Sequence, residues 1–184
     1  MSRVRIAATL AVVLSLAVTS IAFAASSKVT GGTSQITATS QAAAVLASNH
    51  IAVTALAPAT QSGATFTFPI AGGRINPTTF RGVIRSKGGL SISNGTSTFR
   101  VRGFTSVSDR HGGWLFALVR RVGARHWQPE LFARFTNISV SGGTATATAH
   151  LTRASARLLN KLAGRHIVSA GNVIGTSKVS PTLK

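Results

Sequence analysis

Acidic side chains are almost missing from this sequence of 184 residues. Asp109 and Glu130 stand against twenty lysines and arginines, and the formal net charge is +18. Several enzyme classes need more carboxylates, because paired acids cleave glycosides, carboxylate cages hold Ca²⁺ or Mg²⁺, and an acid orients the base of a catalytic triad. The scarcity of acids therefore favours a non-enzymatic binding or structural protein, and we predict no catalytic residue.

Cysteine and tyrosine are absent altogether. Without cysteine the chain has no disulfide, no thiolate nucleophile and no Cys-based zinc or iron–sulfur site. The five histidines are the strong ligands left for a metal ion or haem iron, and none of them pairs with another at a tight ligand spacing. We therefore predict no dedicated metal site.

The N-terminal segment, residues 1–24, has the pattern of a secretory signal peptide. Arg3 and Arg5 precede an apolar stretch, and Ala22-Phe23-Ala24 fits an A-x-A cleavage site. We expect cleavage near Ala24 and a mature protein that is secreted or associated with the cell envelope. An uncleaved anchor is the alternative, because the apolar segment is almost long enough to span a bilayer.

Much of the remaining sequence has the alternating pattern of half-buried strands. In residues 64–70, Phe66, Phe68 and Ile70 fall on one face and threonines on the other. Residues 114–119 are apolar on both faces, which predicts a central strand covered from both sides.

Glycine-containing turns predict two hairpins. Residues 90–102 flank Asn94-Gly95, a dipeptide that suits a type I′ turn. Residues 131–149 flank Ser141-Gly142-Gly143 in the same way.

Two helical stretches interrupt the strands. Thr39 or Ser40 is placed to cap a helix over residues 40–47, and Thr152 to cap another over residues 153–163. The predicted fold is mainly β (α+β), an antiparallel β-sandwich with two short helices.

The two helical regions also resemble each other. The segment Val29–Thr33 before the first helix is echoed by Val140–Thr144 before the second, and a histidine follows each helix. This pattern indicates an internal strand–helix–strand duplication, with chance similarity in a Gly-, Ser- and Thr-rich chain as the alternative. We expect a first strand–helix–strand unit over residues 25–62 to form one domain with the β-rich remainder, residues 63–184, which carries the C-terminal helix.

A series of short motifs runs through residues 66–152. In order they are Phe66-Thr67-Phe68-Pro69, Gly72-Gly73, Phe80-Arg81-Gly82-Val83-Ile84-Arg85 running into Gly88-Gly89-Leu90, Phe135-Thr136-Asn137-Ile138-Ser139-Val140 and Leu151-Thr152. The series resembles the HtaA-type domain of actinobacterial secreted and cell-surface proteins, which is used in haem acquisition. The resemblance implies a β-sandwich with a few short helices at the cell envelope.

The resemblance also implies a way of holding haem, from which this chain departs. Haem-binding members of that family hold the iron through a tyrosine supported by a nearby histidine. This sequence has no tyrosine, and Lys87 stands before Gly88-Gly89, where relatives tend to carry histidine.

A basic loop is the candidate ligand-binding site. It contains His126 and Trp127 together with Arg120, Arg121 and Arg125. An exposed tryptophan would stack on a planar ligand such as a porphyrin, and the arginines would hold its carboxylates. The alternative is a tryptophan folded back over the end of the sandwich.

Two further groups of cations form a candidate anion-binding patch. They are Arg81, Arg85, Lys87, Arg100 and Arg102, expected on one sheet, and Arg153, Arg157, Lys161 and Arg165, which recur every four residues. Like charges at that spacing cost about 0.2–0.5 kcal/mol per pair unless an anion lies against them. The alternative is neutral drift toward arginine, although drift does not explain the missing acids.

The leading hypothesis is therefore a secreted, non-enzymatic HtaA-like binding module that is attracted to a polyanion of the envelope. The expected partner is an anionic cell-wall polymer or an anionic membrane surface, and no nucleic-acid-binding motif is present. The alternative is a haem or porphyrin binding or transfer protein that uses a histidine and the arginine-rich loop.

Overall fold

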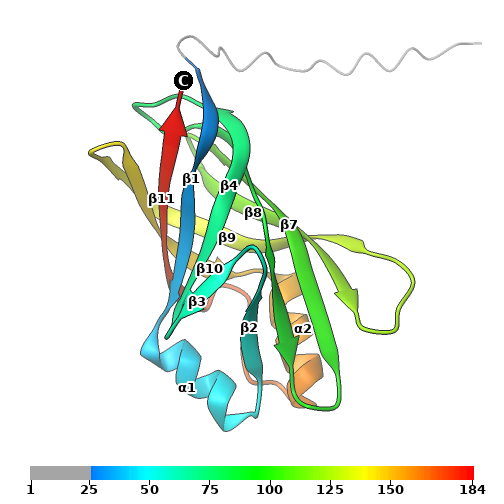
Figure 1. Cartoon of the computed structure of the whole chain (residues 1–184). Helices are drawn as coiled ribbons and strands as arrows, with labels where there is room; N and C mark the ends of the chain where they lie inside the picture. The colour runs from blue at the N-terminus through cyan, green and yellow to red at the C-terminus, as the bar shows by residue number, and fades with distance from the viewer. Residues whose placement is uncertain (1–25) are drawn as a thin grey trace, which may run out of the picture.

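The computed structural model describes residues 26–184, so the predicted signal peptide and its cleavage site lie outside the described residues. These residues form eleven strands and two helices (Figure 1). In chain order they are β1 (Ser27–Ala38), α1 (Ser40–Ser48), β2 (Ala52–Leu56), β3 (Thr60–Ser62), β4 (Thr65–Ile75), β5 (Gly82–Ser86), β6 (Gly89–Ser93), β7 (Thr98–Asp109), β8 (Gly112–Arg121), β9 (Gln128–Ser141), β10 (Thr144–Leu151), α2 (Arg153–Ala163) and β11 (Val173–Leu183).

All eleven strands belong to one antiparallel sheet, and eight of them close into a ring. The ring order is β7-β5-β4-β1-β11-β10-β9-β8, and β8 pairs again with β7. Strands β6 and β2 continue from β7, and β3 pairs with β4 outside the ring. The predicted mainly β, sandwich-like antiparallel fold with two short helices is confirmed.

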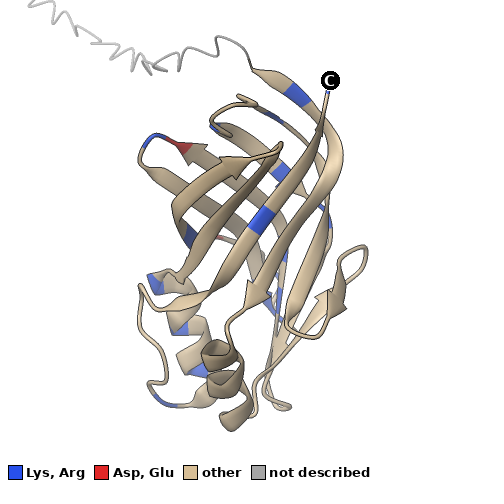
Figure 2. Ribbon diagram, turned by 90° about the vertical axis from the view of Figure 1, so that its left-hand side faces the viewer, with Lys and Arg blue, Asp and Glu red and all other residues tan. Residues whose placement is uncertain are grey.

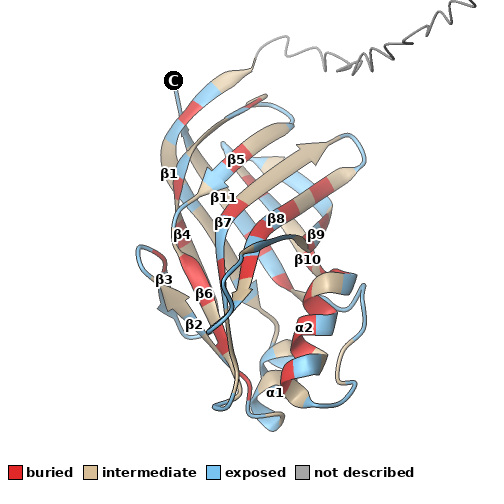
Figure 3. Cartoon of the chain, turned by 90° about the vertical axis from the view of Figure 1, so that its right-hand side faces the viewer, coloured by how far each residue is buried: buried red, intermediate tan, exposed pale blue. Residues whose placement is uncertain are grey.

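The sheet divides along β7. Residues Thr98–Arg102 of β7 pair with β6, whereas Thr105–Ser108 pair with β5. Between β5 and β6 the Lys87 N–H donates to the carbonyl of Pro69 at 2.8 Å. Gly88 has a φ of +89°, and a Cβ there would lie 2.5 Å from the Ala59 backbone nitrogen, so this crossing point requires glycine. Below it β6 and β2 leave the ring, and the two helices cover that end (Figures 1 and 3).

The core fills the inside of the ring and extends to α2. Leu115, Ala117 and Val119 of β8 point inward and are buried, whereas Phe116 is 44% and Leu118 36% exposed. The expectation of a strand covered from both sides is therefore wrong for β8. A ring has only one inside, and both helices lie at its end instead of over the outer face of β8 (Figure 1).

Both hairpins are confirmed, but the type I′ turn is wrong. Asn94 and Ser97 close a longer loop (Asn94 N to Ser97 O 3.2 Å), and of Asn94 and Gly95 only the glycine has a positive φ. The Asn94 side chain accepts from the Thr96 and Ser97 amides and donates to the carbonyl of Leu162 at 2.7 Å. The turn therefore takes its shape from the asparagine side chain, which also ties the hairpin to α2.

Both helices lie where the sequence predicts them. Thr39, and not Ser40, caps α1, since its hydroxyl accepts from the Ala42 amide at 3.1 Å. Thr152 and Ser155 form a reciprocal capping box at the start of α2, and Gly164 ends that helix with a φ of 68°. Within residues 26–184 neither helix has the length and apolar character needed to cross a membrane.

Candidate binding sites

Two cavities adjoin α2. The first, which we call the apolar cavity, has a volume of about 570 Å³ and is bordered by Leu159. The second, which we call the arginine cleft, has a volume of about 490 Å³ and is bordered by Arg157 and Lys161. Ser155 and Leu158 border both, so α2 separates two very different environments.

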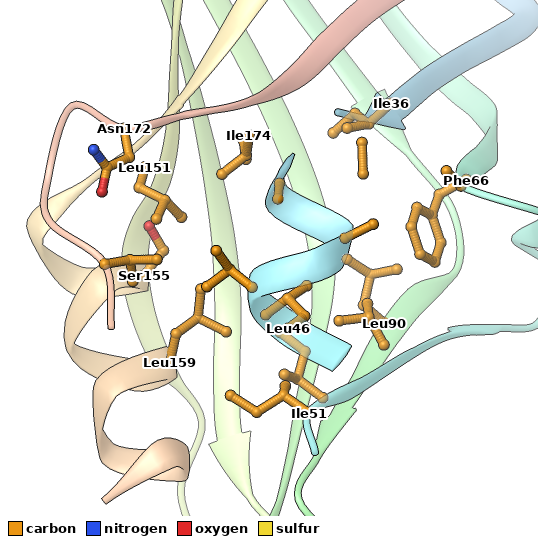
Figure 4. Close-up of a pocket in the computed structure, with 18 of the residues that line it drawn as sticks. Ile36, Leu46, Ile51, Phe66, Leu90, Leu151, Ser155, Leu159, Asn172 and Ile174 are labelled. Carbon is orange, nitrogen blue, oxygen red and sulfur yellow. The ribbon is translucent and has the colours of Figure 1, made fainter. Parts of the chain in front are cut away.

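The apolar cavity lies where the sheet divides. Its walls come from β1 and β4 on one side, β2 and β6 on another, and the two helices (Figure 4). Typical lining side chains are Ile36, Leu46, Phe66, Leu90, Leu159 and Ile174. No lysine, arginine, histidine, aspartate or glutamate is among the described residues that line it.

The few polar side chains of this cavity are largely occupied by the protein itself. Gln61 accepts from the Ala55 amide and donates to the Gly63 carbonyl, both at 3.2 Å. The Ser155 hydroxyl is bonded to the backbone N–H and carbonyl of Thr152. Each of these polar groups therefore already has a partner within the protein.

The arginine cleft brings together residues from two of the predicted groups. Arg120, Arg121, Arg125 and His126 of the candidate loop line it, and so do Arg157 and Lys161 of the helical stripe. Glu130 is also present. The sequence showed two separate clusters, and folding places them around one opening.

Trp127 does not line the cleft but stacks on the outer face of the sheet. The guanidinium carbons of Arg102 and Arg120 lie 3.9 and 4.6 Å from the centroid of its ring. Trp127 is half-buried, so it resembles the folded-back alternative more than an exposed stacking platform. Cation–π contacts of this kind also hold the two arginines close together.

Arg120 is the least satisfied of these cations. It lies directly opposite Arg100 in the β7–β8 register. Its Nε is buried and has no hydrogen-bond partner among the described residues. Like charges at opposed strand positions are destabilising, and an unmade buried hydrogen bond adds to that cost.

The other predicted cations are exposed. Arg81, Arg85, Lys87, Arg100 and Arg102 lie on or beside β5 and β7, and Arg153 lies at the start of α2. Figure 2 shows lysines and arginines both on the sheet and on the helices. Arg165 follows the end of α2 and is exposed too. Its guanidinium donates twice to Oδ1 of Asn49, at 3.1 and 2.9 Å. This contact, the Asn49–Arg165 clasp, joins the far end of α1 to α2.

The histidines do not form a ligand set. Within residues 26–184 no group of three or more histidine, cysteine or acidic side chains is placed to hold a metal ion. His150, which no sequence pattern singled out, is held by Thr136 Oγ1 at 2.8 Å and by the Gly171 carbonyl at 3.0 Å. Its contacts come from strand pairing and a distant loop, so no local signal could have revealed them.

The fold of this protein has relatives among solved structures. The sequence matches no protein-family model and no curated protein. The closed antiparallel sheet with two helices over one end nevertheless has clear counterparts among solved structures, and these counterparts share one fold.

That fold is the HtaA type. The C-terminal domain of HtaA from Corynebacterium glutamicum superimposes with a TM-score of 0.62 at 16% identity, over 86% of this chain and 99% of that domain. The haem-binding protein HtaB from the same organism gives 0.58 at 11% identity, over 86% and 95%. A domain-swapped dimer of a variant HtaA C-terminal domain gives 0.52 at 15% identity, over 70% and 82%. The predicted HtaA-type fold is confirmed.

Proposed function

We propose that this protein is a non-enzymatic binding module that works outside the cytoplasmic membrane and attaches to an anionic polymer of the cell envelope. The observation that carries the proposal is Arg120, which borders the arginine cleft and lies opposite Arg100 in the β7–β8 register. An anion bound in the arginine cleft would offset the repulsion between these two guanidinium groups.

The surroundings of Arg120 support the same assignment. Arg121, Arg125, Arg157 and Lys161 border the same cleft, against the single acid Glu130. Such a concentration of one sign of charge raises the local concentration of anions and accelerates their association. The signal-peptide pattern makes phosphate-bearing wall polymers and lipid headgroups the polyanions within reach.

The test is binding of the mature protein to purified anionic wall polymer over a range of salt concentrations. We expect affinity to fall steadily as salt rises, because screening and counterion release both oppose attachment. The double variant Arg120→Gln, Arg157→Gln should bind markedly more weakly. The matched control Lys178→Gln, Lys184→Gln removes the same charge outside the cleft and should bind nearly as well as the parent.

Two outcomes would contradict this proposal. An affinity that does not change with salt concentration would exclude an electrostatic mechanism. Equal losses in the cleft variant and the control would mean that net charge alone, and not this cleft, attracts the polymer. Vesicles with anionic headgroups, assayed in parallel, distinguish a membrane surface from a wall polymer.

Haem is the second candidate, since HtaB, a structural neighbour, is a haem-binding protein. The apolar cavity does not fit haem, because its lining offers no histidine, tyrosine, cysteine or methionine for the iron and no cation for the carboxylates. The arginine cleft has a suitable donor set: His126 for the iron, and Arg120, Arg121 and Arg125 for the carboxylates.

A haem titration followed by visible absorption tests this candidate. We expect His126→Ala to abolish any Soret shift and the control His50→Ala to retain it, because His50 lies in the loop after α1 and does not line the cleft. Absence of a shift in the parent, or an undiminished shift in His126→Ala, would eliminate haem ligation by His126.

A further inference from the structure

We propose that the apolar cavity binds a single acyl chain and leaves its headgroup in solvent. This site is distinct from the arginine cleft, so the assignment stands or falls independently of polymer attachment. Three features support it: the cavity wall is uncharged, its polar groups already have partners, and α1 is apolar but not buried.

The described residues that line the cavity carry no charged side chain. The chain carries twenty lysines and arginines, yet none of those within residues 26–184 lines this cavity. A carboxylate, phosphate or ammonium group inside would lose its hydration without gaining a charged partner, which is costly. The part of the ligand that enters the cavity is therefore uncharged.

The polar side chains of the cavity wall already have hydrogen-bond partners within the protein or lie exposed. Both ends of the Gln61 amide and the Ser155 hydroxyl are already bonded within the protein. The other polar lining residues, Gln41 and Asn172, are exposed at the rim. A polar ligand would find few partners inside, whereas a hydrocarbon needs none.

Helix α1 leaves apolar surface uncovered beside the cavity. Its sequence from Ala42 to Ala47 is entirely apolar, yet none of the nine residues of the helix is buried. A helix that is apolar all round is normally covered on all sides. Ala42, Val45 and Leu46 border the cavity, so an apolar occupant would bury the surface that the protein leaves uncovered.

The shape of the lining favours a flexible chain. Side chains line the cavity from Phe66 and Ile36 at the β1–β4 wall, past Leu46, to Leu151 and Leu159 beside α2 (Figure 4). Its volume of about 570 Å³ lies within the usual range for small-molecule sites. An acyl chain fills such a space through rotations about its own bonds and requires no ligand atom from the wall.

The experiment uses the mature protein and a series of monoacylglycerols of increasing chain length. Their uncharged headgroup removes the general attraction of a cationic protein for anions. We expect the dissociation constant to fall about fourfold for each added methylene, until the cavity is full. Isothermal titration or displacement of a fluorescent acyl probe measures it.

A matched pair of substitutions on α1 locates the site. Leu46→Glu places a charge in the cavity wall and should weaken binding by at least about tenfold. Ala44→Glu introduces the same residue on the same helix at a position that does not line the cavity, and should bind as the parent does. Ala42→Phe keeps the wall apolar but fills space, so it should shift the preferred chain to a shorter length.

Several results would overturn the assignment. They are the absence of affinity at every chain length, affinity that does not depend on length, and equal binding by Leu46→Glu and Ala44→Glu. Binding of free fatty acids without binding of the monoacylglycerols would mean that the cations capture a carboxylate. A haem Soret shift lost in Leu46→Glu but retained in His126→Ala would place a planar ring in the cavity instead.

Discussion

The two helices cover the same end of the sheet, but they relate to the core in opposite ways. In α2, Ser155, Ala156, Leu158, Leu159 and Leu162 are buried, and Arg153, Arg157 and Lys161 face solvent. In α1 no residue is buried, although the helix is mostly alanine, valine and leucine. Figure 3 shows the contrast between the buried stripe of α2 and the exposed surface of α1.

The difference shows that apolar composition alone does not make a helix part of the core. The leucines of α2 pack in the core cluster, so their burial stabilises the fold. The apolar residues of α1 other than Ala44 line the apolar cavity, so an occupant of the cavity would bury them further. Changes in α2 should therefore act mainly on folding, and changes in α1 mainly on ligand binding.

The largest expected effect comes from placing the same charge on both helices. Leu159→Lys should destabilise the protein by about 3–5 kcal/mol, because it removes a core leucine and buries an unpaired ammonium group. Leu46→Lys should cost less than about half of that, since Leu46 is only partly buried beside the core. Urea unfolding measures both, and equal losses would show that α1 belongs to the core after all.

The N-cap of α2 should also contribute more to the free energy of unfolding than the N-cap of α1. Thr152 is 9% exposed, accepts from the Ser155 amide and donates to the Leu131 carbonyl. Thr152→Ala should therefore cost about 2 kcal/mol, at the upper end for an N-cap. Thr39→Ala, at the cap of α1, should cost about 1 kcal/mol or less. Thermal unfolding of the two variants measures both losses. A larger loss in Thr39→Ala than in Thr152→Ala would contradict this expectation.

A smaller effect is expected from the Asn49–Arg165 clasp. Asn49→Ala or Arg165→Ala should lower the global free energy of unfolding by at most about 1 kcal/mol, as for a typical exposed hydrogen bond. Amides of α1 should nevertheless exchange with solvent faster, because the clasp joins the end of α1 to α2. Hydrogen exchange measures this, and the double variant should add nothing to Asn49→Ala, which also loses the Asn49 amide bond to the Val45 carbonyl. Unchanged exchange in α1 would mean that the clasp does not restrain it.

The smallest effect is expected on the exposed face of α2. Arg157→Gln should raise stability by a few tenths of a kcal/mol at low salt, because it relieves repulsion from Arg153 and Lys161 at the i±4 positions. The gain should vanish at high salt, where screening removes that repulsion. Denaturation at two salt concentrations detects it, and a clear loss of stability would mean that Arg157 has a structural partner.

Local patterns in the sequence located most of the elements but not their partners. The alternation of Phe66, Phe68 and Ile70 and the caps at Thr39 and Thr152 act within a few residues, so sequence alone reveals them. The apolar run of β8 predicts a strand covered on both faces, yet Phe116 and Leu118 are exposed. What covers a strand depends on segments far away along the chain, and no local pattern contains that information.

The candidate sites show the same division. The basic loop and the helical stripe were each recognisable in the sequence, but their meeting around the arginine cleft depends on the packing of α2 beside the β8–β9 loop. The apolar cavity left no motif, because its lining is drawn from ten elements and the linkers between them. Ordinary leucines and isoleucines become a binding site only through their arrangement.

The sequence by itself determined the scarcity of acids, the absence of cysteine and tyrosine, the positive charge and the positions of the caps and hairpins, since these are properties of composition and near neighbours. The tertiary structure alone decided where the sheet divides, at Lys87-Gly88 beside Ala59 and Pro69. That division depends on contacts between residues distant in the chain, and it is what leaves α1 over a cavity and α2 between an apolar wall and a charged one.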